Sequence, residues 1–131
     1  MARVIVLDAS ALIALQDDRD SNNSWAQVFF RSTLDADFAM PALTYAECLA
    51  HPIKTGRADI QDKNLESLGI NLLATDEHRT RAIAEVRANT NLRMPDAIVL
   101  SEALRFGHLA TTDAQLAKAA SDAGLKVYSP V

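Results

Sequence analysis

The sequence predicts an α/β fold with three layers, in which helices cover both faces of a central, mainly parallel sheet. Short apolar runs alternate along the chain with segments whose apolar residues recur at helical spacing, and this alternation is typical of parallel sheets flanked by helices. The first run, V-I-V-L at residues 4–7, holds four consecutive apolar residues, which suits a strand covered on both faces. The length of 131 residues fits a single domain, residues 1–131.

In the first half of the chain, proline and glycine mark where elements end. Pro41 stops the second strand, Pro52 is expected to interrupt or end the helix before it, and Gly69 closes the fourth helix. A polar break at 17–23 separates the first two helices, and Ser21 or a neighbouring Asn can cap the second one. We expect strands at 3–8 and 37–41, and helices from residue 9, over 24–34, from 43 to about 50 and over 58–68.

The second half repeats the alternation. Thr75 or Asp76 is expected to cap a long helix, Pro95 suits the first turn of the next one, and Gly107 and Gly124 end the last two helices. We expect strands at 70–74, 108–111 and 125–128, and helices from residue 75 or 76 through 87, over 96–106 and over 114–123.

Composition limits the class of protein. No segment reaches the ~18 uninterrupted apolar residues of a membrane span, and the N-terminus lacks the apolar core of a signal peptide. The single cysteine, Cys48, excludes an internal disulfide and is compatible with a reducing cytoplasm, where we expect the protein. The formal net charge of -4 makes the chain a poor general nucleic-acid binder, so bound cations and local basic patches would have to attract RNA.

Four acidic residues carry the functional hypothesis. Each lies in or beside an apolar stretch, on a different predicted element: Asp8, Glu47, Asp96 and Asp113. Functional sites of parallel sheets form outside the carboxyl ends of the strands, where these elements can meet. Carboxylates clustered near a core are costly unless a cation holds them, and Mg²⁺ or Mn²⁺ prefers such oxygen ligands. We therefore expect a divalent-metal site that hydrolyses a phosphodiester.

Other interpretations stay open for this set. Asp96 and Asp113 each stand at a helix start, where an acid is also expected for purely structural reasons. An aspartyl-phosphorylated receiver or phosphatase domain would also place an acid after the first strand, but Ser10 stands where the phosphatase pattern needs a second acid. A module that binds RNA or protein without cleaving is the second alternative.

Four motifs in order resemble the PIN-domain nucleases, and in length most of all the VapC toxins of toxin–antitoxin pairs. The motifs are V-L-D-A-S-A-L-I-A-L at 6–15, L-T-Y-A-E-C-L at 43–49, L-R-M-P-D-A-I-V-L-S-E-A-L at 92–104 and H-L-A-T-T-D at 108–113. The resemblance implies a PIN-like, Rossmann-like fold. It also implies a Mg²⁺- or Mn²⁺-dependent endoribonuclease that acts on RNA, is usually a homodimer and is inhibited by a cognate antitoxin.

By motif, the resemblance assigns the catalytic and metal-binding roles to Asp8, Glu47, Asp96 and Asp113. Ser10 and Thr111 match hydroxyls that support the site by hydrogen bonding, although Ser10 could also simply cap the first helix. Two features depart from the pattern. Pro52 breaks the regularity of the helix after Glu47. Residues 114–116 lack the further acid of some relatives, so a second metal would be weakly held or recruited only with the substrate.

Contacts with RNA and with an antitoxin are predicted from surface residue types. The candidates for RNA contact are Arg79, Arg81, Arg87 and Arg93, followed by Lys54, Arg57 and Lys63, and a solvated helix face is the alternative for each. Leu12, Ile13 and Leu15, with the helix around 25–30, are expected to contribute to an apolar groove for an antitoxin helix, or else to belong to the core.

Overall fold

The computed structural model describes residues 2–130, and within them five parallel strands form one sheet with the order β3-β2-β1-β4-β5. The strands are β1 (Val4–Leu7), β2 (Asp37–Pro41), β3 (Ile70–Leu73), β4 (His108–Ala110) and β5 (Lys126–Tyr128). The first strand pairs with β2 on one side and β4 on the other. The predicted α/β fold class with a parallel sheet is therefore confirmed.

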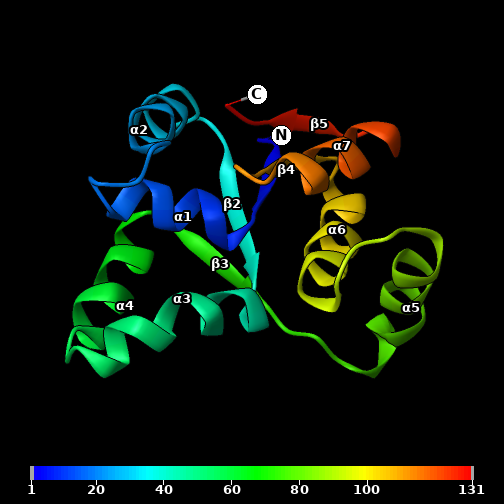
Figure 1. Ribbon diagram of the computed structural model, residues 1–131, viewed down its shortest axis with the longest axis horizontal. Helices are drawn as coiled ribbons and strands as arrows, with labels where there is room; N and C mark the ends of the chain where they lie inside the picture. Colours follow the sequence, from blue (N-terminus) through cyan, green and yellow to red (C-terminus); the bar gives the residue numbers. More distant parts are fainter. Residues whose placement is uncertain (1, 131) are drawn as a thin grey trace.

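Helices cover both faces of this sheet. They are α1 (Ala9–Gln16), α2 (Asn23–Ser32), α3 (Ala42–Lys54), α4 (Ala58–Ser67), the short 3₁₀ helix η1 (Glu77–Arg79), α5 (Thr80–Asn89), α6 (Met94–Phe106) and α7 (Ala114–Asp122). Figure 1 shows α1 and α2 on one side of the strands and α5, α6 and α7 on the other. In the described part of the chain, no helix is long and apolar enough to cross a bilayer.

The alternation of side chains along β1 divides the core into two halves. Successive residues of a strand point to opposite faces of the sheet. Ile5 and Leu7 belong to the cluster that α1, α2 and α3 cover, whereas Val6 belongs to the cluster under α5, α6 and α7. All three side chains are fully buried. A central strand with both faces covered explains why this run of sequence has no polar residue.

Some predicted boundaries are wrong. Pro52 neither ends nor interrupts α3, which continues to Lys54. Proline removes a hydrogen bond and crowds the preceding turn, but Pro52 lies in the last turn of the helix, where little of the helix remains to be disturbed. The long helix expected from residue 75 or 76 starts as η1 and becomes α5 at Thr80. Its expected cap is present, since Asp76 accepts a hydrogen bond from the backbone N–H of His78.

The start of α2 also differs from the expectation of a side-chain cap. Asn22 occupies the N-cap position without a capping hydrogen bond. Its neighbour Asn23 instead donates from its side-chain amide to the carbonyl oxygens of Ala14 and Leu15, at 2.8 and 3.3 Å. The polar residue therefore satisfies carbonyl groups in the last turn of α1 and ties the two helices together.

A buried ion pair joins the helices on the second face. The Glu102 side chain on α6 is only 1% exposed, and its two oxygens bind Arg79 at 2.9 Å and Arg105 at 2.8 Å. Arg79 also donates to the carbonyl and the hydroxyl of Ser101. A buried carboxylate is tolerated only when it is paired, so Arg79 fastens the start of α5 to α6.

We expect Arg79→Met to lower the free energy of unfolding by about 3 kcal/mol, the lower end of the range for breaking a buried pair, because Arg105 still neutralises Glu102. Arg81→Met, at an exposed position two residues further along the chain, is the matched control and should change stability by less than about 0.5 kcal/mol. Urea denaturation of both variants measures this difference. Equal losses would show that the ion pair does not hold α5 in place.

Candidate functional site

Asp8 stands at the carboxyl end of the central strand. Its backbone N–H donates to the carbonyl of Ala110 at 3.0 Å, so the chain is still held against β4 where β1 ends. Thr111 follows β4 at the same edge of the sheet. The pairing of the two parallel strands places Leu7 beside Ala110, and therefore places the two polar residues that follow side by side. Asp8 is 7% exposed.

Two hydroxyl groups fix the orientation of the Asp8 carboxylate. Ser10 and Thr111 donate to its Oδ2 atom at 2.8 and 2.9 Å. Each hydroxyl oxygen in turn accepts a backbone N–H, Ser10 from Thr112 and Thr111 from Asp113, both at 3.0 Å. These backbone donors occupy the lone pairs of the hydroxyls and turn their hydrogens toward Asp8. In the described part of the chain Oδ1 accepts no hydrogen bond, so it is free to bind a cation.

The other three acids come from three different helices around this edge. Glu47 lies on α3, which follows β2 directly, and Asp96 lies in the first turn of α6. Asp113 precedes α7, and its Oδ1 accepts the backbone N–H of Leu116 at 2.9 Å. It is therefore a helix cap, as one of the two interpretations of the sequence had it, and its other oxygen is left for a ligand. Asp96 is half-buried, whereas Glu47 and Asp113 are exposed.

The electrostatics show that the four acids act on one another. Partial burial is the largest cause that raises the pKa of Asp96, from its usual value of 3.8 to about 6. The negative charges of Asp8, Asp113 and Glu47 raise this pKa further. The positive charge of Arg93, at the start of α6, acts in the opposite direction. The carboxylates thus lie close enough to repel each other, as the hypothesis of a shared site requires.

Neighbouring groups feel the same negative field. Partial burial of the carboxyl and the charge of Asp8 raise the pKa of Glu47, although the residue as a whole is exposed. Burial and the charges of Glu47 and Asp8 raise the pKa of the Cys48 thiol to about 12. Cys48 is therefore a neutral, unreactive thiol at physiological pH.

The donor set suits a hard divalent cation, because it consists of carboxylate and hydroxyl oxygens. Among residues 2–130, however, no group of three or more His, Cys, Asp or Glu side chains converges tightly enough to enclose a metal ion. Mg²⁺ keeps several water ligands and is commonly bound by one or two carboxylates together with substrate phosphates. The residues therefore fit an open site, in which Asp8 supplies an oriented oxygen and the other acids supply charge.

The predicted basic residues fall into different environments. Arg79 is taken up by the ion pair with Glu102, so a contact with RNA would have to break that pair. Arg93 is exposed and stands at the N-cap of α6, close to the acids. Arg81 and Arg87 are exposed on α5. No pattern in the sequence indicates the role of Arg79, since its partner Glu102 lies 23 residues away.

The family model described as the PIN domain matches residues 5–122, which include all four acids. The chain belongs to the PIN domain family. This PIN domain is therefore not a phosphoryl-accepting receiver or phosphatase domain, one of the alternatives that the sequence left open. A comparison with curated protein sequences finds no match.

Solved structures share the fold of this PIN domain. A toxin–antitoxin complex from Klebsiella pneumoniae aligns with a TM-score of 0.71 and 20% identity over 83% of this chain and 86% of that chain. FitAcB from Neisseria gonorrhoeae aligns with a TM-score of 0.74 and 20% identity, over 96% of this chain and 97% of that chain. The Sarcin-Ricin loop cleaving toxin VapC20 from Mycobacterium tuberculosis aligns with a TM-score of 0.73 and 15% identity, over 92% of this chain and 95% of that chain. At these identities the comparisons support the fold.

The raised pKa of Asp96 makes the stability of the metal-free protein depend on pH. Between its ordinary pKa and about 6, the folded chain keeps a proton that the unfolded chain has lost, so stability falls as pH rises through this window. Asp96→Asn removes this cost. We expect the variant to melt a few degrees above the wild type at pH 7.5 in EDTA, and the difference to vanish below pH 4.

Asp18→Asn, at an exposed acid in the loop after α1, is the control for the loss of one negative charge. Differential scanning calorimetry from pH 3.5 to 8 measures both variants. A pH-independent difference between Asp96→Asn and the wild type would contradict the mutual repulsion of the acids.

The hydroxyl of Thr111 is expected to matter for metal affinity, because it holds Asp8 in one orientation. Thr111→Val keeps the shape and removes the donor, and should weaken Mn²⁺ binding by about 10–100-fold, as is usual for groups that orient a metal ligand. Thr112→Val changes a neighbouring hydroxyl and keeps the backbone N–H that binds Ser10. Calorimetric titration with Mn²⁺ compares the two, and equal affinities would refute the role of Thr111.

Proposed function

We propose that this PIN domain is a Mg²⁺- or Mn²⁺-dependent endoribonuclease that hydrolyses RNA phosphodiester bonds. The observation that supports it most is the Asp8 carboxylate, with one oxygen locked by two hydroxyls and the other free. Three further acids raise the negative charge around it. An arrangement that stores repulsion at the carboxyl edge of a sheet is suited to a bound divalent cation.

In this proposal Asp8, Glu47, Asp96 and Asp113 would hold the ion together with water, Asp8 through the oxygen that no hydroxyl binds. A divalent ion bound there lowers the pKa of a coordinated water and neutralises charge on the scissile phosphate. The chain itself supplies orientation. The hydroxyls of Ser10 and Thr111 hold Oδ2 of Asp8, which leaves Oδ1 for the ion.

The arginines are proposed to attract the substrate. With a formal net charge of -4, the chain needs local positive charge to hold RNA. Arg93 is the first candidate, because it stands beside Asp96 at the start of α6. Arg81 and Arg87 are exposed on α5 and can extend this contact, whereas Arg79 is committed to Glu102.

We further propose that the protein is the toxin of a toxin–antitoxin pair in the cytoplasm, on the strength of the VapC-like motifs and of similar structures described as toxin–antitoxin complexes. For Leu12 and Phe29 the alternative interpretation holds, since both are core residues. A groove of about 350 Å³ lies next to them and includes Leu15, Phe30 and Leu34, and an apolar helix face could bind there.

A homodimer is part of the same proposal. Several large apolar side chains remain exposed, among them Leu43 and Met94 at the starts of α3 and α6, which are about half exposed. Apolar patches of this kind often mark contacts with another chain. Multi-angle light scattering of the purified protein measures its mass, and a monodisperse monomer would remove the dimer from the proposal.

Cleavage of total RNA with Mg²⁺, and with EDTA in its place, tests the proposed activity. We expect EDTA to abolish cleavage. Asp8→Asn and Asp96→Asn should each reduce cleavage more than about 100-fold, because the loss of a group that merely orients a metal ligand already costs about 10–100-fold. Asp122→Asn, which removes an exposed carboxylate paired with Lys118, is the control and should keep wild-type activity.

Undiminished metal-dependent cleavage by both site variants would refute the proposal. Tight, metal-independent binding of RNA without cleavage would favour the alternative of a non-catalytic module. The open arrangement of the acids, which do not enclose a metal position in the described part of the chain, supports that alternative.

A further inference from the structure

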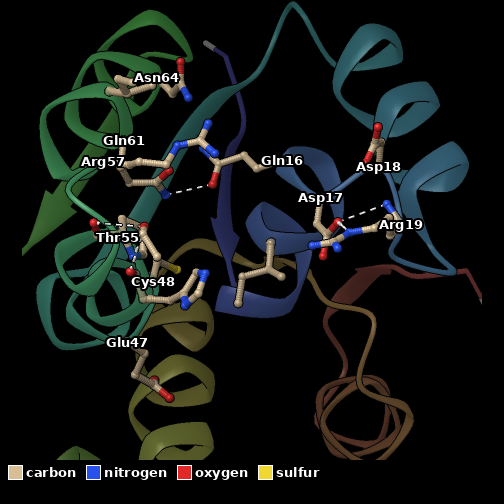
Figure 2. A pocket seen from close by; sticks show the side chains of 14 residues that line it. Gln16, Asp17, Asp18, Arg19, Glu47, Cys48, Thr55, Arg57, Gln61 and Asn64 are labelled. Atoms are coloured by element: carbon tan, nitrogen blue, oxygen red, sulfur yellow. Dashed lines mark hydrogen bonds and ion pairs between the residues drawn. The ribbon is translucent and has the colours of Figure 1, made fainter.

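A cavity of about 620 Å³ adjoins the acidic site. It lies between the end of α1 with the loop that follows, the second half of α3, and α4 (Figure 2). Glu47, one of the four acids, stands at its edge and contributes to its wall. The volume falls within the roughly 300–1,000 Å³ of small-molecule sites. Of the four acids only Glu47 lines the cavity, so this residue connects the cavity to the acidic site.

Two glutamines form the polar part of the wall. Figure 2 shows Gln16 from α1 and Gln61 from α4 facing each other, joined by a hydrogen bond of 2.7 Å from Nε2 of Gln61 to Oε1 of Gln16. Gln61 is only 8% exposed. Within residues 2–130, the Gln61 carbonyl oxygen and the Gln16 amide nitrogen have no hydrogen-bond partner. Gln16 is exposed, and neither glutamine holds a fully buried side-chain atom without a partner in the described part of the chain, so the free donor and acceptor are open to the cavity. A ligand in the cavity can therefore bind to both.

The pair presents one donor and one acceptor next to each other. This holds whichever way the two amides are oriented, since turning both of them only exchanges the donor and the acceptor. Unpaired RNA bases are bound by hydrogen bonds along their Watson–Crick and Hoogsteen edges. The side-chain amide of glutamine matches adenine in particular, with one bond to its amino group and one to a ring nitrogen.

The rest of the wall favours an uncharged base over the phosphate backbone. The apolar side chains Ile13 and Ile60 lie exposed at the cavity, at 43% and 52%, and can cover the face of a base. The acids of the wall outnumber its two arginines by three to two. Phosphate would be repelled by that balance, whereas a neutral base is not.

We infer that this cavity binds one unpaired base of the RNA substrate, adenine before the others, through the Gln16–Gln61 pair, and so fixes which bond lies at the acidic site. The inference rests on the proposed nuclease function. It adds the residues that select the base next to the cleaved bond.

Gln16→Leu and Gln61→Leu test the inference. Gln27→Leu is the matched control, since Gln27 is an exposed glutamine on α2 whose amide also donates to a side chain, Asn23, at 2.8 Å. Each protein is given a pool of unpaired RNA of randomised sequence in Mg²⁺, and the cleaved ends are sequenced. We expect the wild type and Gln27→Leu to favour adenine at one fixed position relative to the cut, and both other variants to lose roughly tenfold of that preference.

A second measurement separates the inference from the proposed function and does not need cleavage. Fluorescence anisotropy measures the binding of oligoadenylate and of oligouridylate to Asp96→Asn, alone and combined with Gln16→Leu. Because Gln16 is exposed, its substitution does not threaten the core as that of Gln61 could. We expect oligoadenylate to bind roughly tenfold more tightly, and Gln16→Leu to erase the difference.

The outcomes are distinct. If the wild type cleaves no RNA, the nuclease proposal fails. The comparison of oligoadenylate and oligouridylate binding then tests by itself whether the cavity binds adenine. If cleavage occurs and both leucine variants keep the wild-type base preference, the inference is overturned, and the cavity is left to another occupant such as a side chain of a partner protein.

Discussion

The interaction on which this site depends is the pair of hydrogen bonds from Ser10 and Thr111 to one oxygen of Asp8. It requires β1 and β4 to be neighbours in the sheet, because the two hydroxyls come from opposite ends of the chain. It also requires the backbone of Thr112 and Asp113 to turn toward the site, since their N–H groups direct the hydroxyls. The result is a buried carboxylate with one oxygen held by two hydroxyls and the other without a hydrogen bond in the described part of the chain.

Such a site is favourable for function and unfavourable for the metal-free fold. Partial burial and the charges of the other three acids raise the pKa of Asp96, and partial burial and the charge of Asp8 raise that of Glu47. In the described part of the chain no ion pair neutralises these acids, and the charge of Arg93 opposes the rise at Asp96 only in part. The stability that this repulsion costs must come from elsewhere. Both faces of the sheet are covered by apolar side chains, and the paired carboxylate of Glu102 fastens α5 to α6.

Much of the fold could be predicted because its signals are local. The apolar run at 4–7 and the glycines that end helices depend on a few neighbouring residues, and the alternation of strands and helices predicts a parallel sheet. The order of the strands was not predicted and comes from the structure. Pro52 was misjudged because the cost of proline depends on its distance from the helix end, which the sequence does not give. The four acids could be picked out by their motifs. Two pairs could not be predicted: Arg79 with Glu102, and Gln16 with Gln61. Each pair joins residues far apart in the sequence, and no sequence pattern indicates such a contact.

The central claim is that the carboxylates at this edge share a divalent cation through the free oxygen of Asp8. A crystal of the protein soaked in Mn²⁺ tests it directly, through the anomalous scattering of the metal. The account predicts a peak bonded to Oδ1 of Asp8 and within reach of Asp96, and no such peak in Asp8→Asn. Manganese bound elsewhere, or the same peak in the variant, would contradict it.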